Sequence, residues 1–325
     1  MSEFDQLLKT LSSIVLQSSP LILAVCGETI TERAGLINLS LDGTMLLAAM
    51  TGFIVGLKTN SLILGFLAAA IIGMLFALIV AFGSIRLKQN QVAIGFVLTL
   101  LGDDLSAFLG QNFTRIRGPY VVKIGIPVLK DIPILGTLFF DQDVVVYFAF
   151  IMIGLTWWFL FRTQPGLKLR GVGERPEAAF ARGVKVNRVR YIYALVGGGL
   201  VGIAGAAYSL DVKLGWSEGH TRGLGWIALA IVIFGGWSPI RGAIGALLFG
   251  ATKALATVLQ RTFPQISVVA FNAIPWILMI AVLLVSTSEL TERFINLMPK
   301  TWQRPLRRFL RVSAPTALGV HFGED

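Results

Sequence analysis

Long apolar runs separated by short polar ones limit how this chain can fold more than any other feature. A bilayer core of about 30 Å takes about 20 apolar residues per helix. The seventh run is short and rich in glycine, so we expect it to cross with tilt or to form half of a broken helix. The pattern predicts an all-α, polytopic helical membrane protein with nine spans, eight and ten being the alternatives, at 12–30, 36–57, 61–83, 91–111, 143–162, 191–211, 223–237, 240–260 and 271–289.

Charged residues are scarce outside the short polar stretches. Only 14% of the 325 residues are charged, against about 25% in an average soluble domain. The net charge of +10 is compatible with nucleic acid as a partner, but Lys and Arg kept on the cytoplasmic side of a membrane explain it more simply. We therefore expect membrane lipid, and no nucleic acid, around this chain. Cys26 is the single cysteine, so no internal disulfide can form.

Basic residues indicate which side of the membrane each loop faces. They gather in the loop 163–190, in the turn around Arg86 and Lys88, and in the tail 290–325. Because cytoplasmic loops carry the excess of Lys and Arg, and the predicted spans put all three segments on one side, we expect all three in the cytoplasm. The C-terminus is then inside and the N-terminus outside. The loop 112–142 is expected at the outer face, either touching a molecule that arrives from outside or acting as a lid without a partner.

The sequence lacks the motifs of an enzyme or of a resident metal site. His220 and His321 are far apart, and Cys26 has no second thiol beside it, so no cluster of metal ligands is expected. No serine lies in a G-x-S-x-G motif, and no G-x-x-x-x-G-K-[ST] loop is present to bind ATP phosphates. We therefore predict no catalytic residue, no metal and no cofactor. Any energy for work has to come from an ion gradient or from another subunit.

The stretch "TERAGLINLSLDGTML", residues 31–46, carries polar side chains among leucines. Asn38, Ser40 and Asp42 alternate with apolar residues, and in a regular helix Asn38 and Asp42 share a face. An Asp in lipid costs about 3 kcal/mol, so it must face a cavity, a partner or an unwound backbone. Two hypotheses follow: these residues line a substrate pathway at a broken helix, or Asp42 caps a helix that begins at Gly43.

A second polar group opens the stretch "KQNQVAIGFVLTLLGDD", residues 88–104. Asn90 and Gln91 stand where a helix is expected to begin, and Thr99 lies further into the same helix. Their amide and hydroxyl groups are suited to hydrogen bonding with a polar, uncharged solute. The alternative is that they are polar groups at the membrane interface where the helix starts.

The basic loop 163–190 contains a short stretch, "PEAAFARG", that predicts a two-turn helix. Pro176 suits the first helical position, Glu177 suits the positive end of the helix dipole, and Gly183 suits the stop. The alanines between them give the helix a face of small side chains. Such a helix on a cytoplasmic loop either docks into a groove of a partner protein or lies on anionic lipid headgroups.

Four stretches resemble, in the right order, motifs of bacterial ABC importer permeases of the branched-chain amino acid and sugar type, the type II permeases. "ERAGLINLSLDGTML" resembles E-R-x-G-x-x-N-[IL]-x-[LI]-[ED]-G-x-M, with Asp42 where Glu is common, and "NQVAIGFVLTLLG" resembles N-Q-x-x-x-G-x-x-L. "GERPEAAFARGVKV" is similar to the coupling pattern G-E-N-P-x-A-A-x-x-x-G-[IV]-x-V, with Arg175 where Asn is usual. "GLGWIALAIVIFGGWSP" is similar to G-x-G-[FW]-I-A-[IL]-A-x-V-x-F-G-x-W-x-P. The stretches extend over most of the chain, from the thirties to residue 260.

The resemblance implies a permease subunit that forms one domain, 1–325, in the inner membrane of a bacterium. It implies cytoplasmic ABC ATPase subunits, a second permease subunit in a hetero- or homodimer, and an extracytoplasmic substrate-binding protein. The most similar branch works with binding lipoproteins of the basic-membrane-protein type and carries nucleosides, related purine compounds or simple sugars. The competing hypothesis is a stand-alone secondary transporter or channel for a small polar solute. Contact with the ATPase falls, by this resemblance, on Glu174, Arg175, Pro176, Glu177, Ala178, Ala179, Arg182 and Gly183.

Overall fold

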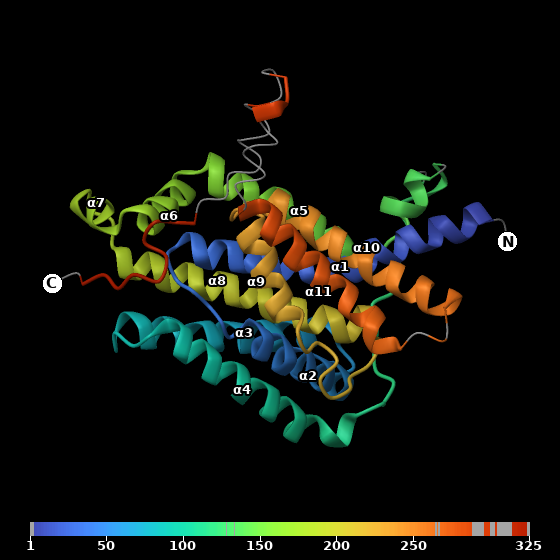
Figure 1. The fold of residues 1–325 in the computed structure, drawn as a ribbon. Coiled ribbons are helices and arrows are strands. Elements are labelled where there is room, and N and C mark those ends of the chain that lie inside the picture. The colour runs from blue at the N-terminus through green and yellow to red at the C-terminus, as the bar shows by residue number, and fades with distance from the viewer. Residues whose placement is uncertain are drawn as a thin grey trace.

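The chain folds into a bundle of helices, and the described part contains no strand beyond isolated bridges (Figure 1). The computed structural model describes residues 3–127, 129–132, 134–263, 265, 267–287, 296–299, 303 and 314–323. The helices are α1 (Glu3–Arg33), α2 (Leu41–Thr59), α3 (Leu62–Ile85), α4 (Gln91–Gly110), α5 (Val144–Arg162), α6 (Gln164–Glu174), α7 (Pro176–Ala181), α8 (Val186–Ala207), α9 (Leu224–Phe234), α10 (Pro239–Thr262) and α11 (Val268–Thr287).

Seven helices in the described ranges are long and apolar enough to cross a membrane: α1, α2, α3, α4, α5, α8 and α10. The expected polytopic, all-α membrane fold is therefore confirmed, while the expected count of nine spans is wrong. The run 223–237 forms only the 11-residue α9, because the backbone turns at Gly235 and then takes positive φ angles at Gly236 and Trp237. The span expected at 271–289 falls on α11 and runs past its end, and most of the expected tail 290–325 lies outside the described residues.

Side-chain caps fix where several helices begin. Asn90 accepts hydrogen bonds from the N–H groups of the first turn of α4, Asp143 accepts one in α5, and Thr163 accepts one from Gly166 in α6. The first backbone N–H groups of a helix have no partner within it, so such caps favour one starting residue over its neighbours.

The helices α3 and α8 pack with their backbones almost in contact. A Cβ atom added at Gly73 of α3 would lie 2.0 Å from the carbonyl oxygen of Gly198, and one added at Gly202 would lie 2.1 Å from the carbonyl oxygen of Ala69. Small residues allow such approach where lipid supplies no hydrophobic force between helices. The close packing of α3 against α8 therefore depends on glycine at positions 73 and 202.

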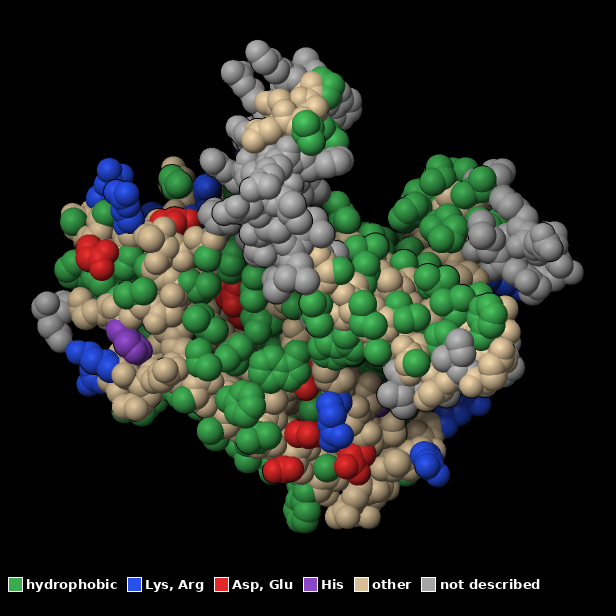
Figure 2. All heavy atoms as spheres, in the orientation of Figure 1, with side chains coloured by type: hydrophobic (Ala, Val, Ile, Leu, Met, Phe, Trp, Pro, Cys, Tyr) green, Lys and Arg blue, Asp and Glu red, His purple; other side chains and the backbone are tan. Residues whose placement is uncertain are grey.

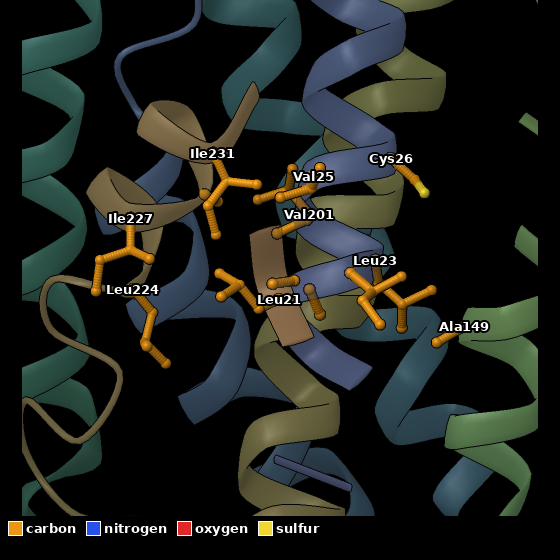
Figure 3. Close-up of a cluster of buried hydrophobic side chains, with 14 of the residues drawn as sticks. Leu21, Leu23, Val25, Cys26, Ala149, Val201, Leu224, Ile227 and Ile231 are labelled. Atoms are coloured by element: carbon orange, nitrogen blue, oxygen red, sulfur yellow. The ribbon is translucent and has the colours of Figure 1, made fainter. Parts of the chain in front are cut away.

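The first helix runs through the middle of the bundle and contacts α5, α8, α9 and α10. Figure 3 shows Leu21 and Val25 of α1 beside Val201 of α8, with Ile231 of α9 turned toward them. All four side chains are buried. This packing joins the N-terminal half of the chain to the segment that follows α8.

The outer surface carries the apolar side chains that a bilayer requires. Ile63 and Ile71 on α3 and Val97 on α4 are all more than 60% exposed. Figure 2 shows hydrophobic side chains over much of the visible face, with several charged side chains near the end that carries α6 and α7. The apolar outer surface fits an integral membrane protein, and Figure 2 also shows charged side chains away from the α6–α7 end.

Candidate functional site

The second helix begins deep in the bundle, after a non-helical turn of residues 34–40 (turn 34–40). An added Cβ at Gly43 would lie 2.5 Å from the Cα atom of Thr99, which stands near the middle of α4. One added at Gly95 would lie 2.8 Å from Leu39 in the turn. Since α4 crosses the membrane, these contacts put the start of α2 at about half its depth.

The short helix α9 begins at the same depth. An added Cβ at Gly225 would lie 2.2 Å from the backbone nitrogen of Asp42. At the other end, Arg33 donates a hydrogen bond of 3.1 Å from Nε to the carbonyl oxygen of Trp237, so α9 ends beside the end of α1. The run 223–237 is thus half of a broken helix, which was one of the two expectations for it.

The carboxylate of Asp42 joins the two helix starts. Its Oδ1 atom accepts hydrogen bonds from the backbone N–H of Gly223, at 2.8 Å, and from that of Gly225, at 2.9 Å. Asp42 is the second residue of α2, whose N-cap is Ser40. The hypothesis that it caps a helix beginning at Gly43 is therefore wrong, because the carboxylate caps α9 instead. The arrangement satisfies a buried carboxylate and orphan N–H groups together.

Asn38 and Ser40 shape turn 34–40 rather than a helix face. The Oδ1 atom of Asn38 accepts hydrogen bonds from the backbone N–H of Ser40, at 3.1 Å, and from its hydroxyl, at 2.6 Å. The Ser40 hydroxyl also lies 3.3 Å from that of Thr44. Since α2 starts only at Leu41, Asn38 and Asp42 do not share the helix face that a regular helix would give them.

Gln91 and Thr99 hold the same turn from α4. Ile37 donates its backbone N–H to the Gln91 side chain at 2.7 Å, and the Thr99 hydroxyl donates to the carbonyl oxygen of Leu39 at 2.8 Å. Gln91 also donates to the Ser84 hydroxyl of α3 at 2.7 Å. Five of the six predicted pathway residues are thus buried around one turn.

The sixth predicted residue, Asn90, lies apart from the others. It is exposed, and its side chain caps α4 by accepting hydrogen bonds from Val92 and Ala93. These contacts match the alternative that it is a polar group where the helix starts.

Further polar residues near this region have partners that the sequence did not predict. Glu28 and Glu32, one turn apart on α1, are both buried, and Glu32 accepts a hydrogen bond from the indole N–H of Trp237. Arg222, just before α9, pairs with Asp103 of α4 at 2.9 Å. Neither the Glu32–Trp237 bond nor the Arg222–Asp103 pair is visible as a local motif, since the partners are more than 100 positions apart.

A polar and aromatic cluster lies before α9 at the end of α8. His220 stacks on Tyr208 with ring centroids 5.5 Å apart, and its Nε2 atom lies 3.1 Å from the Ser209 hydroxyl. Lys253 of α10 donates to the Tyr208 hydroxyl at 3.2 Å. Trp216 in this segment accepts a hydrogen bond at its carbonyl oxygen from the loop 112–142, which is therefore fastened to it.

The region 163–190 is mostly helical, which corrects the expectation of a long loop with one short helix. The predicted helix is present as α7, which starts at Pro176 and is followed by Gly183 with φ +80°. The helix α6 before it was missed. Its signal is a Thr cap with Pro two residues later, since Thr163 caps the helix and Pro165 lies in its first turn.

The predicted coupling residues divide into an exposed and a buried set. Pro176 and Ala179 are buried, and Ala179 packs with Val172 of α6 and Val186 of α8. Glu174 is partly buried and lies 3.8 Å from Arg33 at the end of α1. The side chains free to meet another protein are those of Arg175, Glu177, Ala178 and Arg182, with Gly183 exposed beside them.

Nothing in the described residues resembles a metal centre, since no three His, Cys, Asp or Glu side chains gather there. The two sites are instead a junction of helix ends inside the membrane and a charged pair of short helices at one end of the bundle. We call them the α2–α9 junction and the α6–α7 pair.

Comparison with known families decides what these two sites belong to. The family described as "Branched-chain amino acid transport system / permease component" matches residues 10–283. The chain belongs to this permease family. The resemblance found in the four sequence stretches is thereby confirmed, and the protein is an integral membrane permease.

Individual relatives of this permease cover most of its length. TsgC13 of Haloferax volcanii, whose name assigns it provisionally to glucose transport as an ABC transporter permease, is 40% identical over 75% of this permease and 76% of its own chain. The nucleoside ABC transporter permease protein NupC of Lactococcus lactis is 35% identical over 76% and 81%. The guanosine ABC transporter permease protein NupQ of Bacillus subtilis is 35% identical over 82% and 88%. No solved structure matches this permease.

Proposed function

We propose that this permease is the membrane subunit of an ATP-driven importer for a nucleoside, a related purine compound or a simple sugar. The observation that carries this proposal is the identity of 35% to NupQ over 82% of the chain, since that relative is named for guanosine transport. The permease then works with two cytoplasmic ATPase subunits, a second permease subunit and an external binding protein. Its α6–α7 pair and C-terminus lie in the cytoplasm of a bacterium, and its N-terminus lies outside.

The α6–α7 pair is the proposed contact with the ATPase. Ala178 presents a small, exposed side chain on α7, and Arg175 and Arg182 stand exposed on either side of it. A smooth surface flanked by charge suits insertion into a groove of another protein. Because Ala179 packs inside against α6 and α8, a push on α7 reaches both helices.

The α2–α9 junction is the proposed moving part of the solute path. Two helices that begin inside the membrane leave backbone groups there, and such groups can pair with a polar solute. In this proposal Asn38, Ser40, Asp42, Gln91 and Thr99 keep turn 34–40 in shape while α2 and α9 shift. ATP-driven displacement of α7 would change the packing between two arrangements.

Copurification from native membranes tests the ATPase contact. The tagged wild-type permease should bring down an ATPase with nucleotide-binding motifs and a second permease. Ala178→Trp should lose the ATPase and keep membrane insertion, because the bulky ring stands on the exposed face. Ala181→Ser, also on an exposed position of α7, is the matched control. If Ala178→Trp retains the ATPase at the wild-type level, α7 is not the contact.

A further inference from the structure

The C-terminal residues 314–323, here called the C-terminal strap, return to the end of the bundle that carries α6 and α8 (Figure 1). Ala317 donates its backbone N–H to the carbonyl oxygen of Gly173, at the end of α6, over 2.9 Å. Gly319 donates its backbone N–H to the carbonyl oxygen of Gly35, in turn 34–40, over 3.0 Å. Two backbone hydrogen bonds thus place one strap across two elements distant in sequence.

Side-chain contacts also join the strap to α6 and α7. The Glu174 carboxylate accepts two hydrogen bonds from Thr316, one from the backbone N–H at 3.2 Å and one from the hydroxyl at 2.9 Å. The Phe322 ring meets the Phe180 ring of α7 edge-on, with centroids 5.7 Å apart. The C-terminal strap therefore contacts both helices of the α6–α7 pair.

Arg190 of α8 is buried against the strap. Only 1% of this residue is exposed, and its guanidinium donates a hydrogen bond of 3.0 Å to the carbonyl oxygen of Val320. A Cβ atom added at Gly35 would lie 3.1 Å from the same guanidinium. A buried charge needs acceptors around it, and the strap supplies one of them.

The strap fits a defined path. Ala317 is 5% exposed, and Gly319 has a φ of +75°, which favours glycine. An added Cβ at Gly319 would lie 2.8 Å from the Cδ1 atom of Ile37 in turn 34–40. A side chain at this position would therefore lift the strap from the turn.

We infer that the C-terminal strap is a positioning element of the coupling machinery, fastening the α6–α7 pair to turn 34–40. Turn 34–40 leads directly into Asp42 and the α2–α9 junction, and packed, hydrogen-bonded contacts transmit displacement where loose segments do not. A movement of α7 would then reach the junction through the strap as well as through α8. The inference rests on the proposed function, since it assumes that an ATPase moves α7.

Two strap variants test the inference in the complete transporter reconstituted in proteoliposomes. Gly319→Val should lift the strap, and Thr316→Ala should remove the hydroxyl bond to Glu174, with Thr316→Ser as the rescuing variant. We expect the ATPase to stay bound and ATP to be hydrolysed, while the solute taken up per ATP falls at least threefold in Gly319→Val and less in Thr316→Ala. His321→Ala, an exposed position within the strap, is the control and should keep the wild-type ratio.

A cross-link distinguishes a strap that stays bound to α7 during transport from one that has to detach. In a chain with Cys26→Ala, the changes Phe180→Cys and Phe322→Cys allow a short bifunctional thiol reagent to tie the strap to α7. If the strap transmits movement, the tied protein should keep at least half of the uptake of the untied double variant. If uptake is lost on tying, the strap is a latch that has to detach, and the inference is wrong.

The results separate the strap inference from the proposed function. An unchanged ratio of solute to ATP in Gly319→Val, with normal assembly, overturns the strap inference and leaves the proposed function intact. Failure of the wild-type permease to bind any ATPase overturns the proposed function itself. A Gly319→Val protein that does not assemble is judged by the other two tests. A wild-type ratio of solute to ATP in Thr316→Ala, or a loss of uptake in the cross-linked protein, then overturns the inference.

Discussion

The carboxylate of Asp42 on α2 accepts a hydrogen bond of 2.8 Å from the backbone N–H of Gly223, which lies 181 positions later and directly precedes α9. Both helices begin at this contact, inside the membrane-spanning bundle. Because the first N–H groups of α9 have no partner within their own helix, Asp42 does for α9 what a local cap does for other helices. One side chain thus fixes the relative position of two helix ends.

Removal of this cap should destabilise the permease. We expect Asp42→Ala to lower the free energy of unfolding by about 2 kcal/mol, since it leaves the buried N–H groups of Gly223 and Gly225 unpaired. Asp42→Asn should lose less, because the amide oxygen still accepts. Thermal unfolding of the purified permease in detergent measures both, with Asp104→Ala, an exposed carboxylate on α4, as the control. Equal stability of the Asp42→Ala and Asp104→Ala proteins would contradict the role of Asp42.

Gln91 should matter for turn 34–40 where its neighbour Gln89 does not. Gln91→Leu leaves the Ile37 N–H and the Ser84 hydroxyl without this partner, so we expect a loss of stability of about 1–3 kcal/mol and reduced uptake. Gln89→Leu changes an exposed side chain that donates to the nearby carbonyl oxygen of Leu87 and should behave like wild type. Thermal unfolding and solute uptake of the two variants show whether turn 34–40 depends on Gln91. Similar values for both would mean that turn 34–40 does not depend on Gln91.

The contact between α3 and α8 should not tolerate even one methyl group. Gly73→Ala places its Cβ 2.0 Å from the carbonyl oxygen of Gly198, so the helices must separate, at a cost of about 1–3 kcal/mol. Gly154→Ala on α5 has no atom within 4 Å of the new Cβ and should be neutral or slightly stabilising. Midpoints of thermal unfolding compare the two. A Gly73→Ala protein as stable as the Gly154→Ala protein would refute this packing.

The bond between Glu32 and Trp237 should hold the end of α9 against α1. Trp237→Phe removes the indole donor, and Glu32→Gln weakens the acceptor. A double-mutant cycle on thermal stability should give a coupling energy of about 1 kcal/mol or more, since the bond is buried. Trp158→Phe on α5, at an exposed position, serves as the control for losing an indole. A coupling energy near zero would show that the two side chains act independently.

The sequence was most informative where the signal is local. Apolar run length predicted the fold class, and Pro176 with Gly183 predicted the bounds of α7, because both depend on neighbouring residues. The expected nine spans are two more than the seven found in the described residues. One of the two is the run 223–237, where hydropathy could not distinguish a full crossing from α9 followed by a turn. The helix α6 was missed because its charged residues and glycines are typical of a loop, although Thr163 and Pro165 mark the start of a helix.

The candidate site was only partly predictable for a related reason. Asn38, Asp42 and Gln91 stood out as polar residues in apolar surroundings, but their partners are Ser40, backbone groups of α9 and the backbone of turn 34–40. Contacts with distant backbone carry no sequence motif. The same holds for the C-terminal strap, whose partners lie more than 100 positions earlier.

Solute uptake by reconstituted proteoliposomes tests the central claim, which is that ATP hydrolysis on a separate subunit drives transport through this permease. The measurement compares vesicles holding the permease pair alone with vesicles that also hold the ATPase and the binding protein, for labelled guanosine, other nucleosides and glucose. We predict uptake only with ATP and the ATPase present, and its loss in Ala178→Trp. Solute flux of equal rate through the permease alone, without nucleotide, would contradict the account.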